Sequence, residues 1–199
     1  MRKVLFLFLT SSLAACTGTR YPYSTGFYAY EGGRDGTEFS CGIRDGRFRF
    51  SFRVLDSTVH AVETVAYKRD LERGDRVEVF FSPTADMSKR YYCAEIDPRG
   101  RVLDYSIVYP RKFDYTWSFR TLEKTCTLTP DGYAVEGSVS VEELKSFGID
   151  PKRFWIGVFR ADYDQDEQLV DWHSKVPHGP GDADFHRPCM LFEFLSEKQ

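Results

Sequence analysis

The sequence has little excess of charge of either sign. Its 27 Lys and Arg residues stand against 30 Asp and Glu residues, which gives a formal net charge of −3 over 199 residues. The basic residues are scattered among acidic ones, so neither a nucleic-acid-binding patch nor a polybasic membrane surface is visible. We therefore expect no nucleic-acid partner.

The common catalytic signatures are also missing. The chain contains no G-x-S-x-G, H-E-x-x-H or P-loop motif, so the usual nucleophile, zinc and phosphate sites have no local signature. None of the four histidines lies beside an obvious nucleophile: His60, His173, His178 and His186. The sequence gives no support for catalysis. If the protein is an enzyme, a glycoside hydrolase with two facing carboxylates is the class that its many acidic residues suit best.

Cysteine is sparse. Apart from Cys16 there are four, and no two of them form a C-x-x-C pair: Cys41, Cys93, Cys126 and Cys189. A zinc or redox site is therefore not indicated. In an exported chain these four could form up to two disulfides, in three possible connectivities. Buried free thiols are the alternative, because Cys packs as a small hydrophobic residue.

No hydrophobic run is long enough to span a membrane, since the N-terminal run VLFLFL is far below the roughly 20 residues required. It follows Arg2 and Lys3 and precedes small and polar residues, as in a secretion signal. Residues 13–16, LAAC, resemble a bacterial lipobox. We predict a lipoprotein signal peptide at 1–15, lipidation of Cys16 and a tether at 16–25. An ordinary cleaved signal is the alternative.

Alternation of aromatic and polar residues dominates the rest of the chain, and the full sequence holds 12 Tyr, 17 Phe and 3 Trp. In RFRFSFRVLD, the side chains of Phe48, Phe50, Phe52 and Val54 fall on one face, as in a strand with one buried side. Further strands are predicted at 75–83, 91–96, 101–109, 123–129, 132–140, 153–162, 168–172 and 189–195, with hairpin turns at 97–100 and 130–132.

Only residues 140–148, SVEELKSFG, have the character of a helix. Ser140 can cap it with Glu143 three residues later, and Gly148 can end it. Many short strands with turn signals about every 8 to 12 residues predict an all-β fold. We expect an antiparallel β-sandwich, jelly-roll-like or immunoglobulin-like in appearance, with one short helix and a single domain over 26–199.

Acidic residues gather in DYDQDE, where Asp162, Asp164 and Asp166 alternate. Carboxylate oxygens at this spacing suit calcium. An EF-hand loop beginning at Asp162 would need Gly in place of Glu167 and Glu in place of His173, so that motif fails. A solvated acidic turn between two strands is the interpretation that we favour, and calcium is a candidate structural ion only.

The three tryptophans differ in context. Trp155 lies in a hydrophobic strand and is predicted to be core, whereas Trp117 alternates with Tyr115 and Phe119 and lines a sheet face or fills the core. Trp172 opens the polar, turn-rich stretch DWHSKVPHGPGDADFHRP. Sugars stack their apolar faces on such indole rings while carboxylates and Arg bind the hydroxyls. Trp172 is therefore a candidate ligand platform as well as a candidate core residue.

Several segments, in their order and spacing, resemble the family 9 carbohydrate-binding modules and their DOMON-like relatives. They are DRVEVFFSP, YYCAEIDPRGRVLD, GYAVEGSVSVEEL, FWIGVFRAD, VDWHS and DFHRP. The resemblance covers nearly the whole chain from about residue 30 onward. It implies a β-sandwich, binding to sugars at polysaccharide chain ends, and bound calcium in a structural role.

Matched by position, the resemblance implies part of a sugar site. Trp172 corresponds to one of two Trp that clamp the sugar, and Glu78 to a carboxylate that bonds its hydroxyls. The place of the second Trp holds Glu72, and an Arg expected on the following strand is replaced by Glu95. Half of the clamp is therefore missing at its usual position.

Chemistry rather than the family pattern suggests replacements. We predict that Arg160 supplies the positive charge and that Trp117, or a Tyr of RYY at 90–92, supplies the second ring. With Trp172, Glu78 and Glu95, these residues make the predicted carbohydrate site.

The sequence thus predicts a non-catalytic carbohydrate-binding lipoprotein of the bacterial cell envelope, periplasmic or on the outer surface. Its partners would be an oligo- or polysaccharide and an envelope hydrolase or transporter. One alternative is a hydrolase that uses Glu78, Glu95 and Asp171. Another is a haem-binding DOMON-type electron carrier, which would need axial ligands such as a Met and a His. Apart from the initiator, Met occurs only at Met87 and Met190, and neither has an evident His partner in the sequence. A surface scaffold, recognised by a large apolar patch, is the last.

Overall fold

The computed structural model describes residues 21–29, 34–178 and 184–196. The predicted signal peptide at 1–15 and Cys16 lie outside these residues. In the described part of the chain, no helix is long and apolar enough to cross a membrane. The predicted tether at 16–25 overlaps the first strand, which begins at Tyr23, so the folded part starts before residue 26.

Strands make up most of the described chain. They are β1 (Tyr23–Ala29), β2 (Arg34–Arg44), β3 (Arg47–Leu55), β4 (Arg76–Ser82), β5 (Tyr91–Ile96), β6 (Val102–Val108), β7 (Lys112–Asp114), β8 (Glu123–Thr129), β9 (Gly132–Ser140), β10 (Arg153–Tyr163), β11 (Leu169–Ser174) and β12 (Phe192–Leu195). The helices are short: the 3₁₀ helices η1 (Lys68–Arg73) and η2 (Pro188–Met190), and the α-helix α1 (Val141–Ser146). The predicted all-β fold is confirmed.

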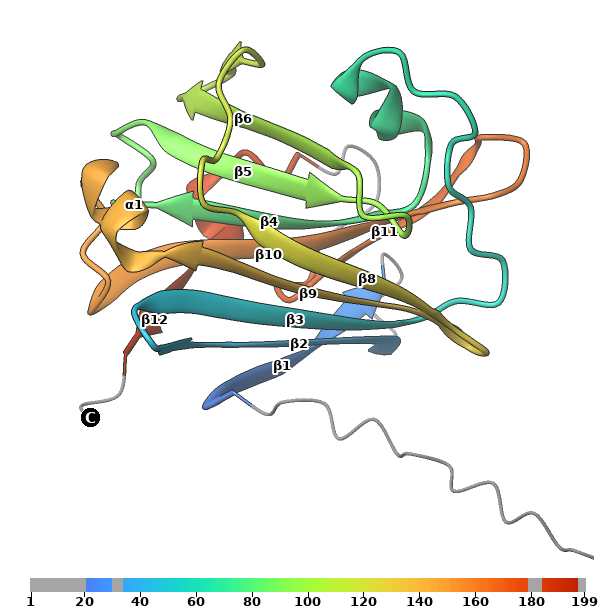
Figure 1. The fold of residues 1–199 in the computed structure, drawn as a ribbon, viewed down its shortest axis with the longest axis horizontal. Helices are drawn as coiled ribbons and strands as arrows, with labels where there is room; N and C mark the ends of the chain where they lie inside the picture. The colour runs from blue at the N-terminus through green and yellow to red at the C-terminus, as the bar shows by residue number, and fades with distance from the viewer. Residues whose placement is uncertain (1–20, 30–33, 179–183, 197–199) are drawn as a thin grey trace, which may run out of the picture.

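The strands form two facing layers (Figure 1). The first layer has the order β7-β6-β5-β4-β10-β11, and the second has the order β1-β2-β3-β9-β8. All pairings are antiparallel, and the layers join where β11 pairs with β1, which among the described residues matches Tyr28 with Ser174 and Ala29 with His173. Strand β12 pairs with the first half of β10. The predicted antiparallel β-sandwich is therefore confirmed.

The core between the layers follows from the alternation in the sequence. On β3, the side chains of Phe48, Phe50, Phe52 and Val54 are completely buried, while their neighbours face outward. On β4 every residue is buried, because both faces of this central strand are covered. The inner face of β4 joins the core between the layers, and its outer face joins a second apolar cluster.

The predicted helix and its caps are present. The Ser140 hydroxyl accepts a hydrogen bond from the backbone N–H of Glu143 at 3.1 Å. Gly148, with φ of +76°, lies in the left-handed region that favours glycine, just after the helix ends. The hairpin at 97–100 is held by the Asp97 carboxylate, which accepts from the backbone N–H groups of Arg99 and Arg101.

The sequence left open whether the four cysteines form disulfides, and in the structure they do not. Cys41, Cys93, Cys126 and Cys189 are all free thiols. Cys41 lies in the core between the layers, whereas Cys93 lies in the second apolar cluster on the far side of the first layer. The sheet itself therefore separates these two residues.

Candidate functional site

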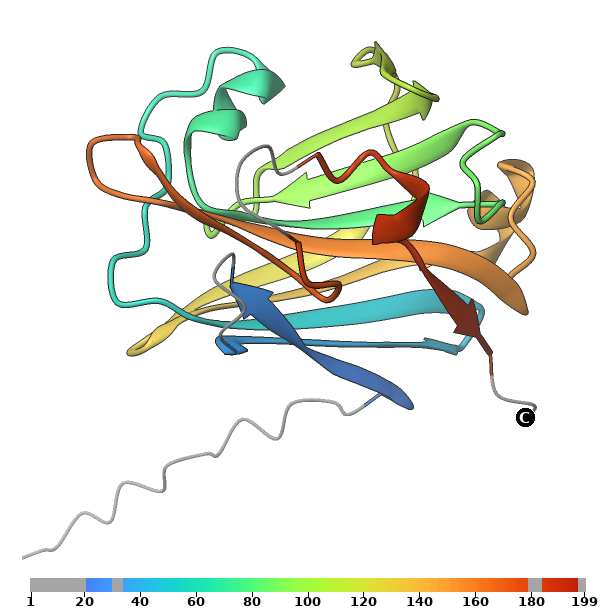
Figure 2. The same ribbon diagram turned by 180° about the vertical axis from the view of Figure 1, so that it is seen from behind.

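The outer face of the first layer, turned away from β1–β3, brings together three residues of the predicted sugar site: Trp172, Glu78 and Glu95. Ala161 of β10 pairs with Arg76 of β4 on one side and with Trp172 of β11 on the other, so these three side chains lie in a row. Glu78 is two residues from Arg76 on the same face and pairs with Glu95 of β5. The C-terminal segment that leads to β12 crosses this face, as Figure 2 shows from behind.

Trp172 is half-buried on this face. The edge of its ring system packs against Phe185, with 5.0 Å between ring centres. The guanidinium of Arg76 lies 5.1 Å from the Trp172 ring centre and 5.7 Å from that of Tyr163. A positive charge beneath an aromatic face is attracted to it. Trp172 and Tyr163 thus flank one guanidinium and keep part of their surfaces in solvent.

Arg76 is held rigidly by its neighbours. Its Nε lies 2.5 Å from Oε2 of Glu95 and 3.3 Å from Oε1 of Glu78. Its Nη1 donates to the backbone carbonyls of Glu72 and Gly74, both at 3.1 Å. The Tyr105 hydroxyl donates to Oε1 of Glu95 at 2.6 Å. Each of these contacts limits the rotation of the guanidinium.

Two carboxyl groups in so small a buried space affect each other. Burial, then the charge of Glu95, raises the pKa of Glu78 well above its usual range, although Arg76 opposes the shift. Burial alone would lower the pKa of Arg76, but Glu95 and Glu78 raise it above its usual value. Arg76 is therefore permanently charged, and Glu78 retains its proton more readily than an isolated carboxyl group would.

The 3₁₀ helix η1 forms a rim beside this cluster. Arg69 and Glu72 make a two-pronged ion pair with both contacts at 3.0 Å, and the Arg69 guanidinium lies 4.7 Å from the centre of the Tyr115 ring. Arg73 ties η1 to the turn after β10 through Glu167 at 2.5 Å. Glu72 occupies the place where the resemblance implies a second Trp. The rim therefore offers charges and the half-buried Tyr115 ring.

Two of the predicted site residues are on this face but enclosed. Glu78 and Glu95 are only 4% and 5% exposed. Their oxygens are engaged by Arg76 and Tyr105, so in this structure they support the site from below and do not present free acceptors to a sugar. Sequence reasoning placed them on the right face and did not foresee their depth.

Arg160 and Trp117 are not brought to Trp172. Arg160 pairs with His173, the neighbour of Trp172, so its side chain points to the opposite face of the layer and is 2% exposed. Trp117 packs against Tyr92 and Phe147, with ring centres 4.9 Å and 5.3 Å away, on the core between the layers. There it borders a separate hollow of about 430 Å³ beside α1. Their predicted contacts with a sugar on Trp172 are therefore corrected.

The residues that sequence reasoning missed are Arg76, Tyr163 and Tyr115. A signal for Arg76 was present, because it alternates with Glu78 on a predicted strand and must share its face. Tyr163 could not have been found in this way, since the register shifts between Asp162 and Tyr163. Tyr115 approaches the face only through the packing of Phe113 and Tyr105.

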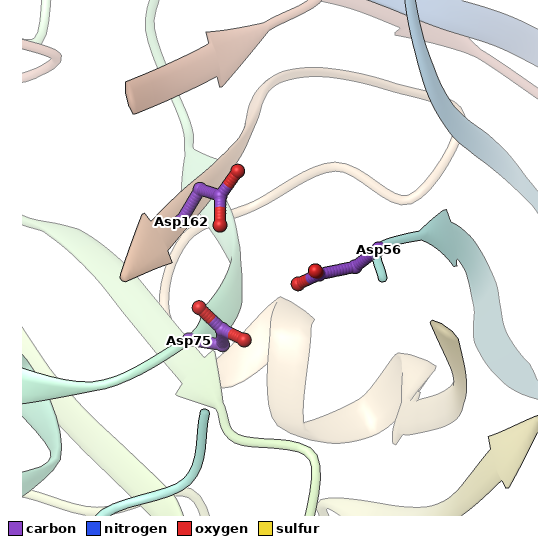
Figure 3. Close-up of side chains that lie close together, drawn as sticks. All are labelled: Asp56, Asp75 and Asp162. Carbon is purple, nitrogen blue, oxygen red and sulfur yellow. The ribbon is translucent and has the colours of Figure 1, made fainter. Parts of the chain in front are cut away.

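A group of acidic residues lies on the other face of the same strands. Figure 3 shows Asp56, Asp75 and Asp162 pointing toward one another, and one oxygen of each lies within 4.8 Å of the other two. Asp75 accepts from the backbone N–H groups of His60 at 2.6 Å and Tyr163 at 2.7 Å. Burial, helped by the charges of Asp56 and Asp162, raises the pKa of Asp75 to about 7.

The spacing of the three carboxylates alone would suit calcium, whose ligands lie at about 2.3–2.6 Å and can be about 5 Å apart across the ion. However, Nη2 of Arg160 already lies 2.9 Å from Asp56 and 3.3 Å from Asp162. Both oxygens of Asp75 accept backbone hydrogen bonds. A guanidinium against two of three ligands repels a divalent cation, so the cluster as it stands does not fit the calcium that the resemblance implies.

The other predicted calcium ligands lie elsewhere. Asp164 accepts from the backbone N–H groups of Asp166 and Gln168, both at 2.9 Å, which closes the turn between β10 and β11. Asp166 is exposed in the same turn. Among the described residues, the acidic group close enough to hold an ion contains Asp162 but neither of these two. The predicted trio does not converge, because Asp164 and Asp166 belong to the turn.

The fold, but not the sequence, matches known proteins. No protein-family model and no curated protein sequence matches the chain. A protein of Bacteroides uniformis with a proposed role in carbohydrate binding matches in structure, with a TM-score of 0.65 and 15% identity over 87% of each chain. A family 9 carbohydrate-binding module of Caldicellulosiruptor kristjanssonii, solved with cellotriose, gives 0.59 and 14% over 88% of this chain and 84% of that one.

This chain has the family 9 fold. A structure of a family 9 module from the same organism, solved with glucose, matches with a TM-score of 0.56 and 17% identity over 88% of this chain and 85% of that one. At such identities the likeness concerns the fold of the family 9 modules. It confirms the architecture that the sequence segments implied, and it does not carry individual sugar contacts across.

Proposed function

We propose that this chain is a non-catalytic carbohydrate-binding module whose sugar stacks on Trp172. The observation that carries this proposal is a half-buried indole on the outer face, backed by a guanidinium that two buried carboxylates hold in place. A flat apolar ring with fixed polar neighbours is suited to the apolar face and hydroxyl groups of a sugar. The family 9 fold, whose solved examples include complexes with cellotriose and glucose, supports the same function.

The rim supplies polar groups for the sugar hydroxyls. Glu72 and Arg69 are both partly exposed and pair with each other, so they offer acceptors and donors in fixed directions. Tyr163, on the other side of Arg76, adds a second half-buried ring and a hydroxyl. Because only one Trp is available for stacking, we expect weak binding, with dissociation constants of about 10 µM to 1 mM.

The titration that tests this proposal follows Trp fluorescence of the domain from residue 21 onward with a panel of plant, microbial and host oligosaccharides. We expect a saturable change in wild type that Trp172→Ala loses. Trp155→Ala is a matched control, because Trp155 is also half-buried on the first layer but lies at the other end of β10, beside Arg153. Loss of the signal in both variants, or in neither, would contradict a site at Trp172.

A hydrolase remains the second candidate because of one observation, the raised pKa of Glu78 beside Glu95. Retaining and inverting hydrolases both need a protonated carboxyl group near a second carboxylate. Against this, both groups are enclosed and bound to Arg76. Release of reducing sugar from any bound oligosaccharide, abolished by Glu78→Gln, would favour the hydrolase.

The N-terminal sequence supports a further part of the proposal, which concerns where the protein is located in the cell. Lipidation of Cys16 after removal of residues 1–15 would tether the module to a membrane of the bacterial envelope, where it could deliver sugar to a hydrolase or transporter. The support is the charged start, the short apolar run and LAAC. Fractionation of cells that express wild type or Cys16→Ser tests this, since the variant should leave the membrane fraction.

A further inference from the structure

Arg160 is a deeply buried cation on the inner face of the first layer, at 2% exposure. It contacts carboxylates from both layers: Asp35 at the start of β2 at 3.5 Å, Asp56 just after β3 at 2.9 Å and Asp162 on its own strand at 3.3 Å. His173 of β11 lies 3.3 Å from Asp35 and 3.6 Å from Asp162. Arg160 therefore links β2, β3 and β10, and His173 joins β11 to the same aspartates.

The charges of this cluster depend on that side chain. Four aspartates meet here with Asp75 included, and Arg160 is the permanently charged cation among the described residues that contact them. Buried carboxylates without a cation are strongly unfavourable, and a planar guanidinium can bond several of them at once. Arg160 thus supplies the positive charge that a structural metal ion could otherwise supply to Asp56 and Asp162.

This cluster and the proposed sugar site are built from alternate residues of the same strands. Asp75 precedes Arg76, Asp162 precedes Tyr163, and His173 follows Trp172. Successive side chains on a strand point to opposite faces. Asp75 also accepts the backbone N–H of Tyr163 at 2.7 Å. Any shift of the inner cluster therefore moves the backbone that carries the residues on the outer face.

We propose that Arg160 is a built-in cation that takes the part of the calcium ion implied by the family resemblance. Its guanidinium holds β2, β3 and β10 together, while His173 ties β11 to the same aspartates, and the cluster so positions Trp172, Arg76 and Tyr163 without a metal. Arg160 is a positioning residue and makes no contact with sugar. Only the last step, the effect on sugar affinity, rests on the proposed function.

The first test uses the wild-type domain and calcium alone. After treatment with EDTA, the protein is titrated with CaCl₂ in a calorimeter, and its melting temperature is measured in EDTA and in 5 mM CaCl₂. We expect no binding heat and melting temperatures that agree within about 1 °C. Calcium binding with a micromolar dissociation constant and a rise of about 5 °C or more would overturn the proposal.

The second test removes the guanidinium. Arg160→Ala should lower the melting temperature by roughly 10 °C, because it leaves buried carboxylates without a cation. Calcium at 5 mM should restore at least half of that loss, and Arg160→Lys, which keeps the charge, should lose less than Arg160→Ala. Arg153→Ala, on the same strand but largely exposed and paired with Glu193, is the control and should change little.

Two results of the Arg160→Ala experiment would contradict the proposed role of Arg160. If Arg160→Ala melts at the same temperature as wild type, the proposal is overturned. It is also overturned if the melting temperature falls and calcium does not raise it again. If Arg160→Ala does not fold, Arg160→Lys and the wild-type calcium titration still test it.

The sugar measurement is kept separate. With a sugar that wild type binds, Arg160→Ala in EDTA should lose at least about tenfold in affinity, and calcium should restore it. Unchanged affinity in a folded variant would overturn the link to the outer face. If wild type binds no sugar, the proposed function fails, while the melting and calcium results still decide the role of Arg160.

Discussion

Two buried arginines lie on opposite faces of one layer, and their surroundings differ. Arg76 faces outward between Glu78 and Glu95, beneath the half-exposed rings of Trp172 and Tyr163. Arg160 faces inward, among aspartates that close the sandwich end. Both are charged and paired with more than one carboxyl group. Only the outer one is next to aromatic surface that solvent can reach.

That difference separates a structural cluster from a candidate binding site. Buried charge alone does not distinguish the two, since each arginine has carboxylate partners at about hydrogen-bond distance. The inner cluster joins strand ends from both layers, whereas the outer cluster fixes one guanidinium under a half-buried indole. The aromatic rim, and not the density of charge, therefore distinguishes the face for which we propose sugar binding.

The largest expected effect comes from Arg76→Met, which removes the cation of the outer cluster. Glu78 and Glu95 would be left buried without their partner, and breaking such a pair costs about 3–5 kcal/mol. Thermal melting should show a fall of roughly 10 °C, and the fluorescence response to sugar should disappear because the Trp172 ring loses its support.

Arg73→Met is the matched control for this change. Arg73 is half-exposed and pairs with Glu167, and such surface pairs contribute about 0–1 kcal/mol. A loss of similar size in both variants would mean that burial of Arg76 has no special importance. Restoration of stability by Glu95→Gln in the Arg76→Met background would support the charge argument.

The fold was predictable from local pattern to an unusual extent. The alternation of Phe48, Phe50 and Phe52 requires one buried face, and the caps of α1 are readable from Ser140 and Gly148. Strand β2 was missed because RDGTEFSCGIR has two glycines and no strict alternation. Strand β1 was taken for part of a tether because its sequence, YSTGFYA, is short and polar at its start.

The site was predictable only in part. Trp172, Glu78 and Glu95 were placed on one face by the resemblance and by alternation. Arg160 was assigned to the sugar by its charge, yet it is one residue from Ala161, which pairs with Trp172, and so it must point the other way. The deep burial of Glu78 was not predictable from the sequence. It depends on η1 and on the segment after residue 184, which approach this face from distant parts of the chain.

The next largest effect is a pH dependence of stability, which we expect from Asp75 in the inner cluster around Arg160. The pKa of Asp75 in the folded protein is about 7, far above its value in the unfolded chain, because of burial and the neighbouring aspartates. The native state therefore binds the proton more tightly, and Asp75 contributes stability below about pH 4 that is lost as the pH rises toward 7. For one such group the slope is at most about 1.4 kcal/mol per pH unit.

Asp75→Asn should remove this slope. The free energy of unfolding of wild type minus that of the variant, from urea titrations, should be larger at pH 5 than at pH 7.5 by roughly 2 kcal/mol. The variant also loses one acceptor for a backbone N–H, but that loss does not depend on pH. Parallel stability curves for the two proteins would show that Asp75 ionises normally.

The smallest expected effect is a gain in sugar affinity from a substitution on η1, and it tests whether η1 faces the sugar. Glu72 occupies the place of the missing clamp Trp, and its side chain is 34% exposed. Glu72→Trp should tighten binding of a sugar that wild type already binds by about fivefold to tenfold, since a well-placed ring contributes about 1 kcal/mol beyond its buried area. Glu72→Ala, which removes the same carboxylate without adding a ring, should change affinity by less than about threefold. If the Trp and Ala variants bind equally, a ring on η1 does not reach the ligand, and the site must then be completed from the β11 side, where Tyr163 lies.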